Sequence, residues 1–199
     1  MSADGRTATS IRWGSGRWTH PPVAAVERGS DLLVTAVEGS DAWRTTSYGF
    51  VHDSEHALLA PFEQDTAVEV EFTAAFSQQF DQAGIFVRVS EKHWVKAGVE
   101  YADGRPQLGA VVTDGRSDWS LAPVPDWRDR RVLMRVSRSG DALTIRAGVD
   151  GGDLRLVRLV PFAPDLVAEA GPFTCAPTRA GLTIAFHAWR TTSVDAALH

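Results

Sequence analysis

Residues 81–120 read DQAGIFVRVSEKHWVKAGVEYADGRPQLGAVVTDGRSDWS. Strands are predicted where apolar and polar side chains alternate, over 83–89, 94–101 and 107–113. Turns are predicted between them, at 90–93 and at Ala102-Asp103-Gly104, where an Asp-Gly pair supplies the positive φ that a tight hairpin needs. This stretch therefore predicts three consecutive antiparallel strands.

The first two of these strands each have one apolar face and one mixed face, because side chains alternate across a strand. The apolar faces consist of Ala83, Ile85, Val87 and Val89, and of Val95, Ala97, Val99 and Tyr101. The mixed faces consist of Gln82, Gly84, Phe86 and Arg88, and of Trp94, Lys96, Gly98 and Glu100. A glycine within a strand often marks the close approach of a ligand or another backbone.

We expect the apolar faces to pack against a second sheet, and the mixed faces to lie side by side on the outer surface. Such a surface would form a polar groove that suits a hydroxyl-rich ligand. The alternative is a solvated lattice of ion pairs among Arg88, Lys96 and Glu100, which would contribute little to stability.

The rest of the chain repeats this pattern of short strands separated by turn signals. Further strands are predicted over 31–37, 67–76, 132–137, 143–149, 154–160 and 181–188. The remaining predictions are an irregular edge strand over 10–22, loops over 39–49 and 123–131, and one short helix over 165–170. Because no amphipathic helix of ordinary length is evident, the sequence predicts an all-β fold, a two-sheet antiparallel jelly-roll sandwich that forms one domain over residues 1–199.

The bulk composition excludes several classes of protein. A net charge of −5 argues against a nucleic-acid partner, since phosphate binders present a basic face. No apolar run approaches the roughly 20 residues that a membrane helix needs, and the N-terminal MSADGRTATS lacks the apolar core of a signal peptide. The one cysteine, Cys175, fits a reducing cytosol. We therefore expect a cytoplasmic protein with no nucleic-acid or membrane partner, and its oligomeric state stays open.

Paired carboxylates are candidates for catalysis, because a glycoside hydrolase needs two of them flanking the scissile bond. Glu69 and Glu71 lie two residues apart on one strand face, about 6.5–7 Å between their Cα atoms. A longer pattern with a third acid is absent, since Thr73 occupies that position. We expect this pair to lie on a solvated sheet face.

Two carboxylates of the opening stretch are the other candidates for a polar site. Glu100 is expected to stay ionised beside Lys96, which suits a nucleophile or a ligand-binding acceptor better than a general acid. Asp118 precedes Trp119, and a carboxylate beside an aromatic ring suits sugar recognition, while a core position for Trp119 is an equal alternative. We predict ligand contacts from Gln82, Lys96, Glu100, Asp118 and Trp119.

The predicted loop over 39–49 supplies a second group of candidates. It contains Trp43, Arg44 and Tyr48, and loops that carry aromatic rings and arginine often form the walls of binding sites. We predict that these three side chains contact a ligand. The alternative is a loop packed over the edge of the sandwich, with Arg44 paired to Asp41.

No metal site and no cofactor are predicted. His52-Asp53-Ser54-Glu55-His56 matches the H-x-x-E-H pattern of inverted zinc proteases, but that pattern requires a helix and this segment lies between predicted strands. Asp150-Gly151-Gly152-Asp153 has too few oxygen ligands for calcium and is explained by a hairpin turn. The sequence also lacks a GxSxG elbow, a P-loop and a dinucleotide fingerprint.

A series of motifs follows in order along the chain. They are Asp41-Ala42-Trp43-Arg44-Thr45-Thr46, Tyr48-Gly49-Phe50, Phe80-Asp81-Gln82-Ala83-Gly84, Trp94-Val95-Lys96-Ala97-Gly98-Val99-Glu100, Val111-Val112-Thr113, Ser117-Asp118-Trp119-Ser120, Gly171-Pro172-Phe173 and Ala176-Pro177. This series resembles a concanavalin A-like family that is usually filed as a domain of unknown function, some of whose members are labelled "regulation of enolase" proteins. The resemblance covers nearly the whole chain. It implies a jelly roll like that of legume lectins and glucanases, and it implies no established activity.

Three functional hypotheses follow from these residues. The first is a lectin-like protein that binds a carbohydrate or another small polar ligand in the groove. The second is a glycoside hydrolase or lyase on the same fold, which uses Glu100 or Asp118. The third is a cytosolic interaction or regulatory module without a small ligand, which an outer face without a concavity would favour.

Overall fold

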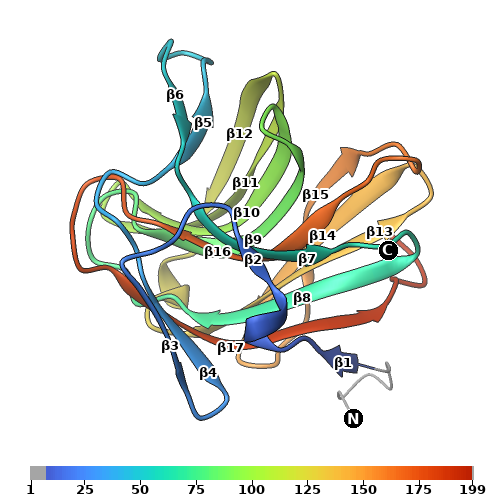
Figure 1. Ribbon diagram of the computed structural model, residues 1–199, viewed down its shortest axis with the longest axis horizontal. Helices are drawn as coiled ribbons and strands as arrows, with labels where there is room; N and C mark the ends of the chain where they lie inside the picture. Colours follow the sequence, from blue (N-terminus) through green and yellow to red (C-terminus); the bar gives the residue numbers. More distant parts are fainter. Residues whose placement is uncertain (1–7, 199) are drawn as a thin grey trace.

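The computed structural model describes residues 8–198, which form two large antiparallel sheets stacked face to face (Figure 1). The prediction that the chain lacks a signal peptide concerned residues 1–10, of which residues 1–7 lie outside the described residues. The predicted all-β sandwich is confirmed. The described residues contain only two short 3₁₀ turns besides the strands, η1 (Trp13–Ser15) and η2 (Pro125–Trp127).

The first sheet has eight strands in the order β15-β14-β13-β8-β17-β4-β3, with β1 paired to β17 outside this path. Its strands are β1 (Ala8–Ser10), β3 (Ala24–Arg28), β4 (Asp31–Thr35), β8 (Thr66–Thr73), β13 (Arg131–Ser139), β14 (Ala142–Val149), β15 (Arg155–Pro161) and β17 (Thr183–Ser193).

The second sheet has seven strands in the order β12-β11-β10-β9-β16-β7-β2. Its strands are β2 (Arg17–Trp18), β7 (His56–Pro61), β9 (Gln82–Ser90), β10 (His93–Ala102), β11 (Arg105–Asp114), β12 (Arg116–Pro123) and β16 (Glu169–Cys175). A separate hairpin of β5 (Ala42–Arg44) and β6 (Val51–Asp53) stands away from the two sheets, beside β12 (Figure 1).

The core lies between the two sheets, and the predicted alternation of faces in β9 and β10 is confirmed. The side chains of β9 and β10 that point inward pack with inward side chains of the first sheet in one buried cluster. These side chains of β9 and β10 are Ala83, Ile85, Val87, Val95, Ala97 and Val99. On the outer face, Phe86 and Trp94 stack at 5.4 Å between ring centroids. They belong to a second buried cluster that also contains Trp43 of the hairpin. The hairpin therefore covers one part of the outer face.

The predicted elements differ from the structure in three places. The segment 39–49 is not a loop throughout, because Ala42–Arg44 pairs with Val51–Asp53. The strand β12 was not predicted, although Asp114-Gly115 is the same hairpin signal as Asp103-Gly104. The predicted helix over 165–170 is absent, and β16 begins at Glu169.

The strand β16 was missed because Gly171 and Pro172 lie in its middle, and both residues are unusual in a central strand. The structure accommodates them with an interruption. The strand pairs with β9 along its length, whereas its pairing with β7 skips from Ala170 to Phe173. Proline has no N–H to donate, so the interrupted pairing leaves no unpaired donor at Pro172.

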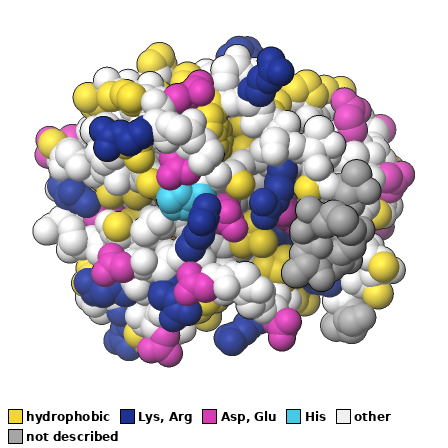
Figure 2. Space-filling model, turned by 90° about the horizontal axis from the view of Figure 1, so that it is seen from below, with side chains coloured by type: hydrophobic (Ala, Val, Ile, Leu, Met, Phe, Trp, Pro, Cys, Tyr) yellow, Lys and Arg dark blue, Asp and Glu magenta, His cyan; other side chains and the backbone are white. Residues whose placement is uncertain are grey.

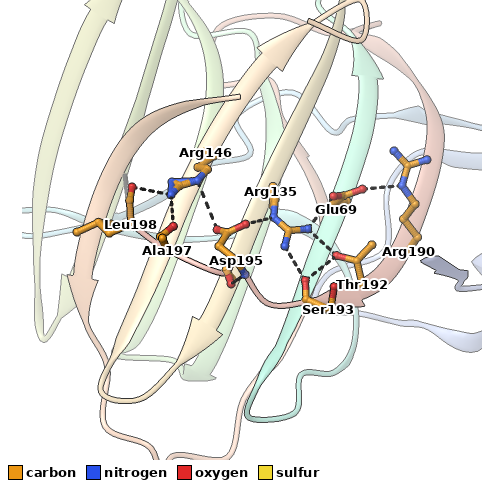
Figure 3. Close-up of polar contacts among 10 residues, drawn as sticks. Glu69, Arg135, Arg146, Arg190, Thr192, Ser193, Asp195, Ala197 and Leu198 are labelled. Atoms are coloured by element: carbon orange, nitrogen blue, oxygen red, sulfur yellow. Dashed lines mark hydrogen bonds and ion pairs between the residues drawn. The ribbon is translucent and has the colours of Figure 1, made fainter. Parts of the chain in front are cut away.

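Glu69 does not lie on a solvated face as predicted, because it takes part in a buried ion-pair network (Figure 3). Its carboxylate accepts from Arg135 Nη1 and Arg190 Nε, each at 2.7 Å. The Arg135 side chain is fully buried and also binds Asp195 at 2.8 Å. The network thus attaches the segment after β17 to the outer face of the first sheet, and it occupies Glu69 fully.

Basic, acidic and apolar side chains are mixed over the face of the molecule that Figure 2 shows. No large single-sign field dominates that face. The described residues contain no helix with the length and apolarity that a bilayer crossing requires.

Candidate ligand-binding groove

A row of three glycines crosses the middle of the second sheet. Gly84 lies opposite Gly98, and Gly98 lies opposite Gly109 in the next strand. A Cβ atom at Gly84 would lie 2.1 Å from the Ala97 carbonyl oxygen, and a Cβ at Gly109 would lie 2.0 Å from that of Ser120. Only glycine therefore fits, and the row leaves a strip of the outer face without side chains.

A buried ion pair lies beside this strip. Lys96 is 5% exposed, and its Nζ donates to Asp41 Oδ1 and to Gln82 Oε1, each at 2.8 Å. In the register, Lys96 is opposite Phe86 and Gln82 is opposite Glu100, so this contact spans the glycine pair that lies between them. The missing glycine side chains give the long lysine room to reach its two partners.

Asp41 and Lys96 are both ionised at neutral pH. Burial alone would raise the pKa of Asp41, but the charge and hydrogen bond of Lys96 outweigh it and hold the pKa below its usual value. Burial would likewise lower the pKa of Lys96, but the charge of Asp41 raises it above its usual value. Each charge of the pair thus offsets the cost of burying the other, which a buried charge requires.

Glu100 behaves in the opposite way. It lies beside Gln82 in the sheet, and its Oε1 is buried without a hydrogen-bond partner among the described residues. Burial raises its pKa to about 7 against the opposing charge of Lys96, and the charges of Asp41 and Asp103 add to the rise. Glu100 is therefore not held fully ionised at neutral pH as predicted, because the ammonium of Lys96 hydrogen-bonds to Asp41 and Gln82 instead.

Three aromatic rings stand beside these polar groups and form an aromatic wall. Trp43 meets Tyr48 edge-on at 5.7 Å between centroids and meets Trp119 edge-on at 6.0 Å. Trp43 is almost buried, whereas Trp119 is 38% and Tyr48 60% exposed. The Arg44 amide donates to Ser117 Oγ at 2.9 Å, which attaches the hairpin to β12 and so joins the rings from both elements.

The aromatic wall and the polar groups line one cavity of about 160 Å³. Its lining residues are Asp41, Trp43, Tyr48, Phe80, Gln82, Lys96, Glu100, Val111 and Trp119. Six of the eight predicted ligand-contact residues therefore meet at one place on the outer face. We call this place the groove.

Arg44 and Asp118 do not line the groove. The Asp118 carboxylate binds Arg158 of β15 at 2.9 Å, because strand parity turns Asp118 away from the face that carries Trp119. The alternative pairing of Arg44 with Asp41 is also wrong, since Asp41 pairs with Lys96.

Three groove residues were not among the predicted ligand contacts: Asp41, Phe80 and Val111. Asp41 is 55 residues before Lys96, so no local spacing signals their contact. Phe80 has a φ of 67°, which is rare for a bulky residue and strained. Its carbonyl accepts from Gln82 Nε2 at 3.2 Å, so the strained residue helps to orient the amide at the centre of the groove.

His56 of the H-x-x-E-H segment is not positioned as a metal ligand. The segment runs from β6 into β7 and contains no helix. The two ring nitrogens of His56 contact the His20 carbonyl at 3.0 Å and the Val37 amide at 3.0 Å, and the ring is buried. Burial lowers its pKa, so the ring is neutral and its hydrogen-bonding capacity is used by the backbone.

Two stacked antiparallel sheets with a partly aromatic groove on one outer face define a concanavalin A-like β-sandwich with a candidate ligand site. The chain belongs to the family described as "Protein of unknown function (DUF1349)", which matches residues 18–194. "Regulation of enolase protein 1" of Saccharomyces cerevisiae is 36% identical over 185 residues, which is 92% of this chain and 93% of the relative.

Solved structures agree with this fold. A functionally unknown protein from Saccharomyces cerevisiae gives a TM-score of 0.86 at 34% identity, over 92% of this chain and 98% of the other. A lectin from Bauhinia forficata, solved in complex with GalNAc, gives a TM-score of 0.59 at 14% identity, over 97% of this chain and 100% of the lectin. The lectin shows a shared fold alone.

Proposed function

We propose that the groove binds a carbohydrate. The observation that carries this proposal is the meeting, in one cavity, of an aromatic wall with buried hydrogen-bonding groups. A sugar presents apolar C–H faces that stack on aromatic rings and hydroxyls that both donate and accept hydrogen bonds. A ligand site of this kind combines apolar walls with a few oriented polar groups.

Each groove residue has a role in this proposal. The Lys96 ammonium has three donors and uses two on Asp41 and Gln82, so one is left for a ligand hydroxyl. Glu100 donates while protonated and accepts through its unpartnered Oε1. Trp119 and Tyr48 have exposed ring surface for stacking, and Trp43 supports them.

The charge balance favours a neutral sugar. The charges of Lys96 and Asp41 neutralise each other in their ion pair. Glu100, with a pKa of about 7, is mostly protonated at pH values below 7. A ligand with a full charge would meet no uncompensated opposite charge below pH 7.

We also propose that this protein acts in the cytosol, because Cys175 is a free, buried thiol that suits a reducing compartment.

Calorimetric titration with a panel of neutral monosaccharides and oligosaccharides at millimolar concentration tests the proposal. We expect binding to at least one sugar, and we expect Trp119→Ala to weaken it about tenfold or more. Stacking of nucleic-acid bases on an aromatic ring is worth roughly 1–3 kcal/mol, and we expect a comparable contribution from a sugar face. Leu159→Ala is the matched control, since Leu159 is 47% exposed and lies outside the groove. If none of the sugars in the panel binds, the proposal is wrong.

Catalysis on a bound sugar is the second candidate function, and one observation favours it. Asp41 and Glu100 line one cavity with pKa values displaced in opposite directions, which is the usual sign of an ionised base and a protonated acid. Glu100 would protonate the glycosidic oxygen as its bond to C1 breaks. Water would add its hydroxyl to C1 and lose its proton to Asp41.

Release of reducing sugar from oligosaccharides distinguishes catalysis from binding. An enzyme of this kind would release sugar as wild type and lose at least a hundredfold in rate as Glu100→Gln. Binding without release would leave a lectin-like protein. The third hypothesis, an interaction module without a small ligand, has less support because the outer face is hollowed by the groove.

A further inference from the structure

We propose that the site takes a chain of at least two linked sugar rings, one in the groove and the next in a second cavity on the other part of the aromatic wall. This inference rests on the proposed carbohydrate function and deepens it. It follows from a feature that the groove alone does not explain, namely that the same three rings line two cavities.

The second cavity has a volume of about 450 Å³. Its lining residues are Trp43, Thr46, Ser47, Tyr48, Ser117, Asp118 and Trp119. Trp43, Tyr48 and Trp119 also line the groove, so the two cavities are neighbours with a common aromatic wall. A ligand longer than the groove would extend past these rings toward the second cavity.

The volumes favour occupation of both cavities by one ligand. Ligand sites in proteins usually enclose about 300–1,000 Å³, and a cavity of about 150 Å³ holds one small ring. The groove, at about 160 Å³, is thus sized for one ring. The second cavity brings the combined site into the range of a larger, linked ligand.

The polar groups of the second cavity suit sugar hydroxyls. Arg158 holds the Asp118 carboxylate by its Oδ2 at 2.9 Å, while no residue of 8–198 contacts Oδ1 by a hydrogen bond. Arg158 is itself positioned by Ser120 Oγ at 3.0 Å. Because the Asp118 carboxylate lies on the opposite face of β12 from Trp119, the hydroxyl side chains of Thr46 and Ser47 supply the polar contacts of the second cavity.

The turn of the hairpin is shaped to present Ser47 and Tyr48. Thr45, Ser47 and Gly49 have φ values of 57°, 62° and 75°, and the first two are strained because they are not glycine. Several hydrogen bonds hold this conformation; among them, the Gly49 amide donates to Thr45 O at 2.7 Å, and Trp43 Nε1 donates to Thr46 O at 3.0 Å. Backbone strain that is held in this way is typical of functional sites.

Two β-1,4-linked series test the inference by calorimetry: glucose, cellobiose and cellotriose, and xylose, xylobiose and xylotriose. We expect the disaccharide of a series that binds to bind at least tenfold more tightly than its monosaccharide. Ser47→Gly should remove most of that gain and leave monosaccharide affinity unchanged. Ser47→Gly is a mild change to the fold, because glycine adopts positive φ without strain.

Ser77→Gly is the matched control, since Ser77 is exposed and lines neither cavity. Equal affinities for monosaccharide and disaccharide would overturn this inference and leave the proposed function intact. Equal loss of both affinities in Ser47→Gly would also overturn it. A failure of both series and of the wider sugar panel would overturn the inference together with the proposed function.

Discussion

Asp41 and Glu100 share one cavity, yet they respond to burial in opposite ways because Lys96 compensates only the first of them. The consequence is a pH-dependent cost of ionising Glu100. Its folded pKa of about 7 lies above the usual value of 4.5, so the folded state resists its ionisation. The stability that this group contributes is complete below about pH 4.5 and is lost as the pH rises through 7.

Glu100→Gln should remove this dependence. Between pH 5 and pH 8 the wild type should lose roughly 2–3 kcal/mol of unfolding free energy relative to the variant. Urea denaturation at both pH values measures the difference. A constant difference between the two proteins across this range would show that Glu100 is ionised throughout.

At the scale of the elements, the glycine row fixes how closely β9, β10 and β11 approach. Gly98→Ala would place a Cβ atom 2.1 Å from the Ala83 carbonyl oxygen, which is backbone and cannot move aside. We expect a loss of roughly 3 kcal/mol or more, the upper end of overpacking effects. Gly14→Ala is the control, because its Cβ would meet nothing within 4 Å, and thermal unfolding of both variants provides the comparison.

The strands that the sequence predicted well are those in which local alternation and packing agree. In β9 and β10 each inward residue is apolar, so the parity that assigned Lys96 and Glu100 to the outer face was correct. In β16, Gly171 and Pro172 hide the alternation, and only the pairing with β9 reveals a strand.

The groove was predictable only where its residues come from consecutive strands. Gln82, Lys96 and Glu100 are neighbours through the register of one hairpin. Asp41 contacts Lys96 from a distant segment of the chain. Asp118 was wrongly predicted to line the groove because β12, which sets the direction of its side chain, was not predicted. Tertiary contacts of this kind have no signal in local spacing.

At the scale of the whole molecule, the network around Arg135 joins the end of the chain to the first sheet (Figure 3). Arg135→Ala would leave the carboxylates of Glu69 and Asp195 without this partner. We expect a loss of roughly 3–5 kcal/mol, the usual cost of removing one partner of a buried ion pair.

Arg116→Ala is the control for Arg135→Ala, because Arg116 is exposed on β12 and its loss should change stability by less than about 0.5 kcal/mol. Guanidinium denaturation measures both variants. A small effect in Arg135→Ala would mean that the remaining network, including the 2.7 Å contact of Arg190 with Glu69, compensates by itself.

Among residues 8–198, the strands of the β5–β6 hairpin pair only with each other; its rings line both cavities, and Ser47 lines the second. Its turn, residues 45–50, can therefore vary in length and composition without disturbing the ladder of either sheet. A few substitutions in this turn would change the wall that faces a ligand while both sheets stay intact. Redesign of this turn is thus a direct route to altered selectivity, with the rest of the protein serving as an unchanged support.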